Sequence, residues 1–395
     1  MIDFDEAVRL VGEIALPLGR ERLAIADARG RILAEPVLAR MSAPPSDVSA
    51  MDGYAVRETD LDLFPAALKV IGESFPAGGC EARLNAGEAV RIFTGAPIPE
   101  GADRVVMQEN VHREGALAII DEAPGPGRHI RGRGSDFKEG DILLEPGRPM
   151  DARALVAAAA ADVAEVAVWR QPRLFVLSTG DELVDPGQAR DGSGTIPESV
   201  SFGVAALALD WGATFVGKRR LRDELPTMER IAGEALASAD ILVVTGGASV
   251  GEKDYAKQMF APYGLDLIFS KVAIKPGKPV WLGRAGRTIV IGLPGNPGSA
   301  LVTARLLLAP LLAGLSGRPP ASALRWRPAP LAAAIGPCGA RETFARARWL
   351  NGMAVPLSNQ DSSAQKMLAM ADILVRRRAC APARDAGEMV DVLDF

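Results

Sequence analysis

Three glycine-rich loops in the second half of the chain carry the residue types that bind phosphates and oxyanions. Each loop follows an apolar stretch typical of a buried strand and precedes a helix start: Thr179–Glu182, Thr245–Asp254 and Gly292–Ser299. In an open parallel sheet such loops line one crevice at the carboxyl ends of the strands. Glycines let a ligand approach the backbone, and free N–H groups at helix starts favour anions. For any single loop, glycine that only permits a tight turn is the alternative.

Carboxylates lie on and near these loops. Asp181 and Glu182 follow the first strand, Glu252 and Asp254 lie in the second loop, and Asp223 follows a further strand end. Acidic groups beside phosphate-binding amides repel an anion unless a cation bridges them, and Mg²⁺ is commonly held by one or two carboxylates plus phosphate oxygens. The pattern favours a magnesium-dependent phosphate site. Capping of helix N-termini is the alternative role, and it fits Asp254.

A lysine-rich segment supplies positive charge. Lys271, Lys275 and Lys278 fall within eight residues, in a stretch stiffened by Pro276 and Pro279. Their spacing suits a clamp for an oxyanion or a pyrophosphate. A solvated charge run is the alternative, although a Pro-Gly frame is not typical of one.

Two common nucleotide-binding fingerprints are excluded. The glycine spacing from Gly246 to Gly251 resembles a Walker A loop, but Glu252 stands where the lysine would be. Gly132-Arg133-Gly134 lacks the third glycine and the preceding strand of a dinucleotide-binding motif. Any nucleotide chemistry must therefore use another type of loop.

The composition excludes further classes. The chain has 45 basic and 49 acidic residues, a net charge of −4, so no general nucleic-acid-binding surface is expected. It has two histidines, His112 and His129, and three scattered cysteines. This rules out a zinc-finger-type site and argues against a disulfide framework.

The first 170 residues predict a helix followed by β structure. At roughly 100–200 residues per domain, 395 residues give two to four domains. Residues 3–16 predict an amphipathic helix, and Asp151 should cap an alanine-rich helix that ends near residue 161. Between them, short apolar stretches separated by Gly/Pro turns predict β-rich modules. The expected strands include residues 68–71, 90–93, 105–108, 118–120 and 142–144.

The second half predicts an α/β domain. Apolar strands alternate with helices, which argues for a doubly wound, mostly parallel sheet. The expected strands are 174–177, 213–217, 241–244 and 288–291, and the expected helices are 199–211, 225–238 and 299–313. After residues 317–320 the sequence again has short apolar stretches typical of strands, which predicts a small all-β C-terminal domain.

No membrane association is expected. The N-terminus is acidic and amphipathic, unlike a signal peptide. The apolar run from Leu301 to Leu315 is interrupted by Arg305 and is shorter than a bilayer span. The expected location is the cytoplasm.

Taken together, these segments resemble the molybdopterin molybdenumtransferase family, which includes MoeA and the E domain of gephyrin. The resemblance covers nearly the whole chain, and its motifs include SAMDGYAV at 49–56, FTGAPIP at 93–99, RHIRGRGSDFKEGDILL at 128–144, LSTGDELVDPG at 177–187, TGGASVG at 245–251 and IGLPGNPGSAL at 291–301. The TGG-type loop alone is shared with MogA/MoaB-type and CinA-like proteins. The motifs in this order are specific.

The resemblance implies an activity. The family inserts molybdate into adenylyl-molybdopterin, cleaves the pyrophosphate bond with Mg²⁺ and releases AMP during molybdenum cofactor biosynthesis. Two alternatives remain open: a non-catalytic or altered-specificity paralogue that binds and delivers a molybdopterin form, and a pyrophosphatase acting on other nucleotides. The sequence does not distinguish molybdate from tungstate.

The resemblance also implies roles for individual residues. Catalytic roles fall on Asp52, Thr94, Asp136 and Glu182, with Lys271, Lys275 and Lys278 near molybdate or pyrophosphate. The metal pair is Asp223 and Asp254. Pterin-nucleotide contacts fall on Thr179, Gly180, Gly246, Gly247, Ser249, Gly292, Pro294, Gly295, Asn296, Arg346 and Ser362.

The implied architecture is an elongated homodimer in which the partner's N-terminal β domain completes each cleft. The resemblance assigns residues 1–45 and 133–171 to an elongated domain, 46–132 to a β-rich insertion, 172–317 to a MogA/MoaB-like α/β domain and 318–395 to a β-barrel-like domain. A molybdopterin adenylyltransferase and apo-molybdoenzymes are the expected partners.

The sequence departs from the family pattern at three places. Val200 stands where the family has Asn in an Asp-Ser-Asn-Ser run, and Val48 replaces an Asn before the first motif. Asp361 and Ser363 depart from a Gln-Gly-Ser-Gly/His pattern. The acidic and lysine positions are retained, so we expect an enzyme.

Overall fold

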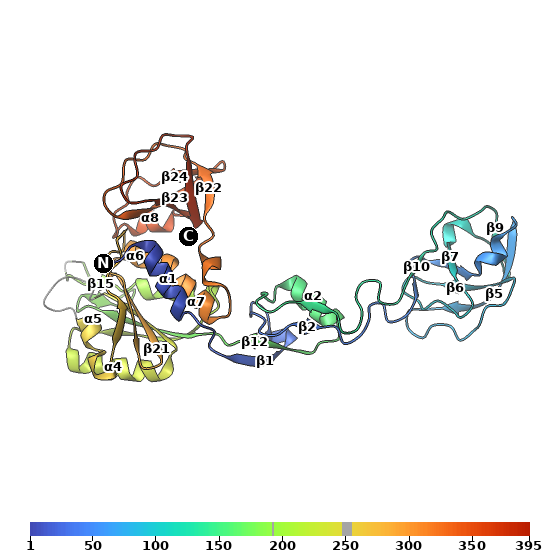
Figure 1. Ribbon diagram of the computed structural model, residues 1–395, viewed down its shortest axis with the longest axis horizontal. Coiled ribbons are helices and arrows are strands. Elements are labelled where there is room, and N and C mark those ends of the chain that lie inside the picture. The colour runs from blue at the N-terminus through green and yellow to red at the C-terminus, as the bar shows by residue number, and fades with distance from the viewer. Residues whose placement is uncertain (192, 247–254) are drawn as a thin grey trace.

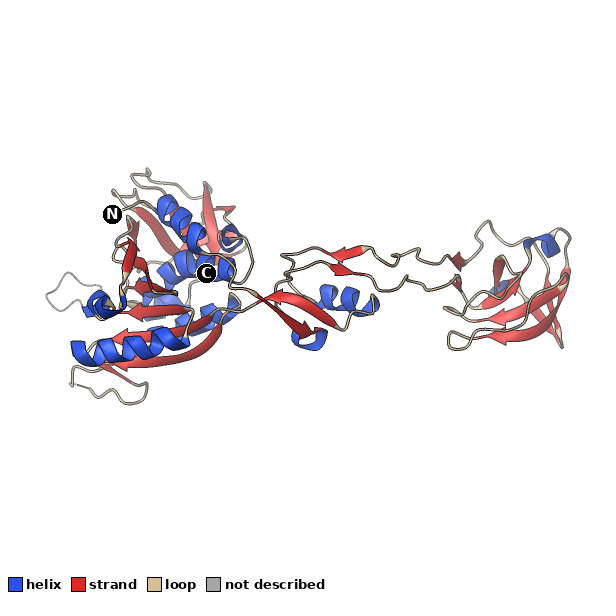
Figure 2. Ribbon diagram, turned by 60° about the horizontal axis from the view of Figure 1, so that its bottom comes forward, coloured by secondary structure: helices blue, strands red, loops and turns tan. Residues whose placement is uncertain are grey.

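The protein is elongated, and a computed structural model describes residues 1–191, 193–246 and 255–395. An α/β domain and a C-terminal β domain lie together at one end, a small middle domain follows, and a β-rich distal domain lies at the other end (Figure 1). The middle domain joins the distal domain through two long chain segments, and both termini lie at the α/β end (Figure 2).

The α/β domain is built on one mixed sheet with the strand order β16-β13-β17-β21-β20-β18. Its first four strands are parallel to one another, β20 is antiparallel to β21, and β18 is antiparallel to β20. The strands are β13 (Arg173–Thr179), β16 (Thr214–Leu221), β17 (Ile241–Thr245), β18 (Asp266–Phe269), β20 (Trp281–Ala285) and β21 (Thr288–Leu293). The prediction of a mostly parallel sheet is confirmed.

Helices cover both faces of this sheet, as a doubly wound fold requires. One apolar core joins the sheet to α3, α6, α7 and α1, and a second core joins the opposite face to α4 and α5. The helices are α1 (Phe4–Ile14), α3 (Val200–Asp210), α4 (Leu225–Ser238), α5 (Tyr255–Gln258), α6 (Pro297–Thr303) and α7 (Ala309–Leu315), and a π-helical turn at Ala304–Leu308 links the last two.

The continuous helix Pro297–Leu315 is long and apolar enough to cross a membrane, but 94% of its most apolar window is buried inside the protein. Arg305, which interrupts the apolar run, donates hydrogen bonds to the carbonyls of Asp394 at 2.7 Å and Ala323 at 2.6 Å. The helix therefore forms part of the core of the domain, and Arg305 links it to the C-terminal strand by the hydrogen bond to Asp394.

The C-terminal domain is a small barrel-like sheet. The strand order is β19-β23-β25-β26-β22, and β24 pairs with β23. A bridge between Leu331 and Ala354 joins the end of β22 to β24 and closes the ring. The elements are β19 (Ile274–Lys275), β22 (Arg327–Pro330), β23 (Glu342–Leu350), β24 (Met353–Pro356), α8 (Gln365–Ala369), β25 (Ile373–Arg377) and β26 (Met389–Asp394).

The middle domain consists of two short antiparallel ladders and one helix around a small apolar core. Asp151 caps that helix as predicted, because its carboxylate accepts a hydrogen bond from the Ala154 amide at 2.9 Å. The elements are β1 (Arg20–Ala24), β2 (Val37–Leu38), β11 (Ile142–Leu144), α2 (Ala152–Ala160) and β12 (Glu165–Trp169).

The distal domain holds the predicted β-rich module. Its sheet has the order β7-β4-β6-β5-β9-β8, and a ladder of β3 with β10 stands where the chain enters and leaves. The strands are β3 (Val48–Ser49), β4 (Gly53–Val56), β5 (Ala66–Ser74), β6 (Glu88–Ile92), β7 (Arg104–Met107), β8 (His112–Glu114), β9 (Leu117–Ile120) and β10 (Ile130–Arg131).

The first helix departs from the expectation that residues 1–45 belong to the elongated domain. Phe4, Ala7 and Val11 of α1 lie in the α/β core. The ring centres of Phe4 and of Phe344 from the C-terminal domain are 4.8 Å apart. The apolar face of α1 therefore fills the groove between two other domains. The chain enters the middle domain only at β1.

A carboxylate fixes the linker between the middle and α/β domains. Asp240, 13% exposed, accepts hydrogen bonds from Arg170 and Arg173 and from the backbone amide of Arg173. Burial acts to raise the pKa of Asp240, but the hydrogen bonds of Arg170 and Arg173 outweigh it and hold the pKa below its ordinary value. The ion pair therefore stabilises the native state at neutral pH.

We predict that Asp240→Asn lowers the stability of the α/β domain by about 1–3 kcal/mol at pH 7 in urea unfolding. The pKa of Asp240 is lower in the native state than in the unfolded chain, so its ion pairs contribute their full stability only above the unfolded pKa. This contribution is lost as the pH falls through the native pKa. The difference in unfolding free energy between wild type and Asp240→Asn should therefore shrink below about pH 4. Glu234→Gln, in an exposed pair with Arg230, is the control and should change stability by less than about 0.5 kcal/mol. A difference that does not change with pH would contradict the assignment.

Candidate active site

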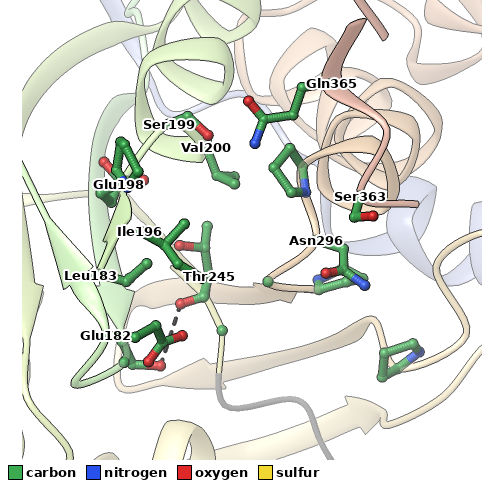
Figure 3. Close-up of a pocket in the computed structure, with 18 of the residues that line it drawn as sticks. Glu182, Leu183, Ile196, Glu198, Ser199, Val200, Thr245, Asn296, Ser363 and Gln365 are labelled. Carbon is green, nitrogen blue, oxygen red and sulfur yellow. Dashed lines mark hydrogen bonds between the residues drawn. The ribbon is translucent and has the colours of Figure 1, made fainter. Parts of the chain in front are cut away.

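A cleft of about 600 Å³ opens at the carboxyl ends of β13, β17 and β21. Its walls come from the loops after these strands, from residues 182–200, from Asp223 and from the C-terminal domain (Figure 3). The lining residues are Thr179, Gly180, Glu182, Leu183, Ile196, Pro197, Glu198, Ser199, Val200, Asp223, Thr245, Gly246, Pro279, Pro294, Gly295, Asn296, Pro297, Ser363 and Gln365. The crevice expected from the strand–loop–helix pattern is therefore present.

The glycines of the loops let the loops pack against one another. Gly246 has φ +88°, and a Cβ there would lie 2.4 Å from the carbonyl oxygen of Thr179. A Cβ on Gly295 would lie 3.3 Å from the Cα of Gly246. Only residues without a side chain allow this approach. Part of the glycine content thus shapes the floor of the cleft itself.

One wall is apolar. The short ladder of β14 (Leu183–Val184) with β15 (Ile196–Pro197) places Leu183 and Ile196 on the cleft, and Val200 follows at the start of α3 (Figure 3). Ile196 is half exposed, so apolar surface is open to a ligand. The departure Val200 therefore lies on the ligand-facing wall, whereas Val48 is buried in the distal domain.

A buried carboxylate supports that wall. Glu198 is 5% exposed and accepts hydrogen bonds from the amide of Ser201, at 2.8 Å, and from its hydroxyl. The ammonium of Lys218 lies 3.7 Å from the Glu198 carboxylate. These contacts fix the start of α3, and with it the position of Val200.

Carboxylates also line the cleft. Glu182 and Asp223 both face it, and the Asp223 amide donates a hydrogen bond to the Asp181 carboxylate at 3.1 Å. Oxygen ligands of this kind suit Mg²⁺, which takes one or two carboxylates and completes its shell with phosphate oxygens and water. Among residues 1–191, 193–246 and 255–395, no three or more His, Cys, Asp or Glu residues are grouped to hold a metal ion. Asp254 lies outside the described residues.

The C-terminal domain closes one side of the cleft. Ser363 and Gln365 line it, and the side-chain amide of Asn296 donates to the hydroxyl of Ser362 at 2.9 Å. The Gly298 amide donates to the Ser362 carbonyl at 2.8 Å. These bonds fasten the loop of the C-terminal domain to the start of α6.

Arg346 lies beneath that loop. It is 1% exposed and donates a hydrogen bond to the carbonyl of Asp361 at 2.6 Å, with longer bonds to Asn359 and Ala364. Its Nε is buried without a hydrogen-bond partner among the described residues. Arg346 and Ser362 therefore hold the loop that bears Ser363 and Gln365, one layer behind the cleft surface.

The three lysines are not among the residues that line the cleft. Lys271, Lys275 and Lys278 are exposed, and the Val272 amide donates to the Lys278 carbonyl at 3.1 Å. Pro279 lines the cleft directly after Lys278. The lysine segment thus reaches the cleft at Pro279, next to the positive charge of Lys278.

Gly292 serves the packing of the sheet. It pairs with Trp281 across β20 and β21, and a Cβ on Gly292 would lie 1.9 Å from the indole nitrogen. Gly292 and Trp281 are buried, and Gly292 does not line the cleft. The glycine is required by a neighbouring ring in the protein.

Asp52 and Thr94 form a second cluster, in the distal domain. The carboxylate oxygen Oδ1 of Asp52 accepts hydrogen bonds from the Thr94 amide at 2.7 Å and from its hydroxyl at 2.8 Å. The Thr94 amide, then its hydroxyl, lower the pKa of Asp52. The distal domain is separated from the cleft of the same chain by the whole middle domain (Figure 1). Asp136, exposed in a turn next to Ala43, lies in neither cluster.

The structure therefore divides the candidate residues. Eight of them line one cleft: Thr179, Gly180, Glu182, Asp223, Gly246, Pro294, Gly295 and Asn296. Gly247, Ser249 and Asp254 lie outside the described residues. Sequence reasoning missed the ligand-facing Leu183, Ile196, Ser363 and Gln365, because an exposed apolar or polar side chain carries no local signal.

Two family models match the chain. The MoeA N-terminal region (domain I and II) matches residues 2–161, and a probable molybdopterin binding domain matches residues 175–314.

Curated relatives and a solved structure agree with these matches. A molybdopterin molybdenumtransferase of Haemophilus influenzae is 37% identical over 354 residues, covering 89% of this chain and 86% of the relative. One of Nostoc is 37% identical over 73% of this chain and 68% of the relative. A crystal structure of the molybdopterin biosynthesis protein MoeA of Pyrococcus horikoshii superimposes with a TM-score of 0.85 at 29% identity, covering 100% of this chain and 99% of that one. This chain belongs to the molybdopterin molybdenumtransferase (MoeA) family.

Proposed function

We propose that this protein is a molybdopterin molybdenumtransferase, which inserts molybdate into adenylyl-molybdopterin, cleaves the pyrophosphate bond and releases AMP. The observation that carries the proposal is a cleft in which glycine loops, the carboxylates of Glu182 and Asp223 and an apolar wall meet. The relatives named above carry the same activity in their names, which supports it. We place the reaction in the cytoplasm.

The loops and the start of α6 are the proposed site for the anionic part of the substrate. Backbone N–H groups at a helix start favour negative charge, and donors held in place stabilise charge that develops on phosphate oxygens. The wall of Leu183, Ile196 and Val200 is the proposed contact for a flat ring system of the substrate. Lys271, Lys275 and Lys278, exposed on the segment that reaches the cleft at Pro279, are the groups that we propose attract molybdate, a dianion.

Asp223 and Asp254 are the residues that we propose would hold Mg²⁺, and Glu182 lines the same cleft as Asp223. The bound ion would neutralise charge on the pyrophosphate oxygens. Glu182 lines the cleft next to the loop at Gly180 and is the proposed group that holds or moves a proton at the scissile phosphate. It is exposed, so its carboxylate is accessible to a ligand.

We further propose a homodimer in which the distal domain of one chain completes the cleft of the other. In one chain Asp52 and Thr94 lie far from the cleft, across the middle domain (Figure 1). If both clusters act on one substrate, two copies must supply them. An adenylyltransferase must supply the activated pterin, and apo-molybdoenzymes must take the product.

The first test is the reaction itself. Purified protein with adenylyl-molybdopterin and Mg²⁺ should release AMP when molybdate is added and not without it, measured by chromatography of the nucleotide. Tight binding of the substrate without molybdate-dependent AMP release would contradict the enzyme and favour the delivery protein. Hydrolysis of unrelated dinucleotides at a similar rate would favour a general pyrophosphatase.

The second test is Glu182→Gln. The amide keeps the shape of the side chain but neither accepts a proton nor carries charge, so we expect kcat for AMP release to fall about 10²-fold. Substrate affinity by calorimetry should stay within about threefold, because the glycine loops remain. Glu224→Gln is the matched control: the exposed Glu224 carboxylate accepts a hydrogen bond from the Thr227 hydroxyl at 2.8 Å and does not line the cleft, so the activity of this variant should equal wild type. Normal turnover of Glu182→Gln would remove Glu182 from the catalytic group.

The third test is complementation between chains. Chains carrying Asp52→Asn and chains carrying Glu182→Gln, each impaired alone, are co-expressed with different tags and purified as heterodimers. A shared site leaves one of the two clefts intact, so the heterodimer should have about half of the wild-type activity per dimer. If each cleft used its own chain's distal domain, the heterodimer would be no more active than the single variants.

A further inference from the structure

Arg91 contacts two aromatic rings next to the Asp52–Thr94 cluster. It is half buried on β6, directly opposite Tyr54 of β4. Its guanidinium carbon lies 5.0 Å from the ring centre of Tyr54 and 5.1 Å from that of Phe93. Cation–π contacts at such distances restrain a guanidinium group. The side chain is therefore restrained by two separate ring contacts.

The hydrogen bonds of Arg91 reach the segments that bear Asp52 and Thr94. One nitrogen, Nη1, donates to the Gly53 carbonyl at 3.1 Å, and the other, Nη2, donates to Oε1 of Gln108 at 2.6 Å. Gly53 directly follows Asp52, and the Gln108 amide donates to the Asp52 carbonyl at 3.1 Å.

The stacking partner completes this connection. Phe93 directly precedes Thr94, and its ring also stacks on that of Phe75 at 4.8 Å. One planar cation thus contacts the chain on both sides of the Asp52–Thr94 hydrogen bonds, through the Gly53 carbonyl and the Phe93 ring. A lysine has neither the planar fork nor the stacking face to do both.

Asp52 keeps an open oxygen. Both Thr94 bonds end on Oδ1, and in the part of the chain that the structure describes Oδ2 accepts no protein hydrogen bond. The positive charge of Arg91 acts in the same direction as the Thr94 bonds, which lower the pKa of the Asp52 carboxyl. The open oxygen is therefore an ionised acceptor with a fixed direction.

We infer that Arg91 is a positioning residue that holds Asp52 and Thr94 in one geometry, with the free oxygen of Asp52 directed to the substrate. The inference rests on the proposed function for the role of that pair in turnover. The geometry of the pair is independent of turnover.

The experiment compares Arg91→Gln, Arg91→Lys and a control, Arg113→Gln, in the full-length protein. Arg113 lies exposed on β8 of the same sheet and donates only to the Gly115 carbonyl among the described contacts. The titration of the Asp52 carboxyl is followed by carbon NMR with labelled aspartate, and its signal is assigned by its loss in Asp52→Asn. Turnover is measured as kcat and KM.

We expect Arg91→Gln to raise the pKa of Asp52 by about 0.5 unit or more, because a nearby positive charge is lost. Its kcat should fall about 10–100-fold with KM changed less than about threefold. Arg91→Lys, which keeps the charge, should leave the pKa near wild type but not restore kcat. Arg113→Gln should match wild type in both.

Other outcomes would overturn the inference. If Asp52 titrates as in wild type in Arg91→Gln and kcat is unchanged, Arg91 does not position the pair. A loss of thermal stability without either change would make its role purely structural. If wild type shows no turnover, the proposed function fails, and the titration still decides whether Arg91 acts on Asp52.

Discussion

The parallel register of three strands is the constraint on which the candidate site depends. Ser178 of β13 lies opposite Thr245 of β17, and Thr245 lies opposite Leu293 of β21. Because these residues are paired in register, the carboxyl ends of β13, β17 and β21 lie side by side at the same edge of the sheet. The loops that follow must share one space, and glycine at 246 and 295 lets them do so. The cleft, the carboxylates that line it and the start of α6 beside it all follow from this alignment.

The cleft is shaped by two domains that are fixed to each other. Arg305 donates a hydrogen bond to the Asp394 carbonyl, and Asn296 donates one to the Ser362 hydroxyl. Within the C-terminal domain, Arg346 supports the loop that bears Ser362 by its bond to the Asp361 carbonyl. The aromatic contact of Phe4 with Phe344 adds a third attachment through α1. The bonds of Arg305 and Arg346 are half-buried and the Phe4–Phe344 contact lies in the apolar core, whereas the Asn296–Ser362 bond is exposed. The C-terminal wall of the cleft is thus attached to the α/β domain at several points.

The distal domain presents a second polar cluster on a rigid sheet, far from the cleft of its own chain. Its geometry is local: Thr94 and Arg91 fix Asp52 from neighbouring loops and strands. The middle domain, with short ladders and one helix, spaces the two clusters apart. An enzyme that needs both clusters on one substrate is thereby made dependent on a second copy, which links the elongated shape to the proposed reaction.

The sequence by itself determined the local structure and the chemistry of the loops. The strand–helix alternation, the Asp151 cap and the β-rich module depend on side-chain period and turn residues within a few positions, and the structure has them. Of the glycine loops, the described residues Gly180, Gly246 and Gly295 line the cleft together with the carboxylates of Glu182 and Asp223. The tertiary structure alone decided that Gly292 makes room for Trp281, that α1 packs between two other domains, and that Ile196 and Gln365 face one cleft. These features depend on which distant surfaces meet, and such long-range packing leaves no pattern in neighbouring residues.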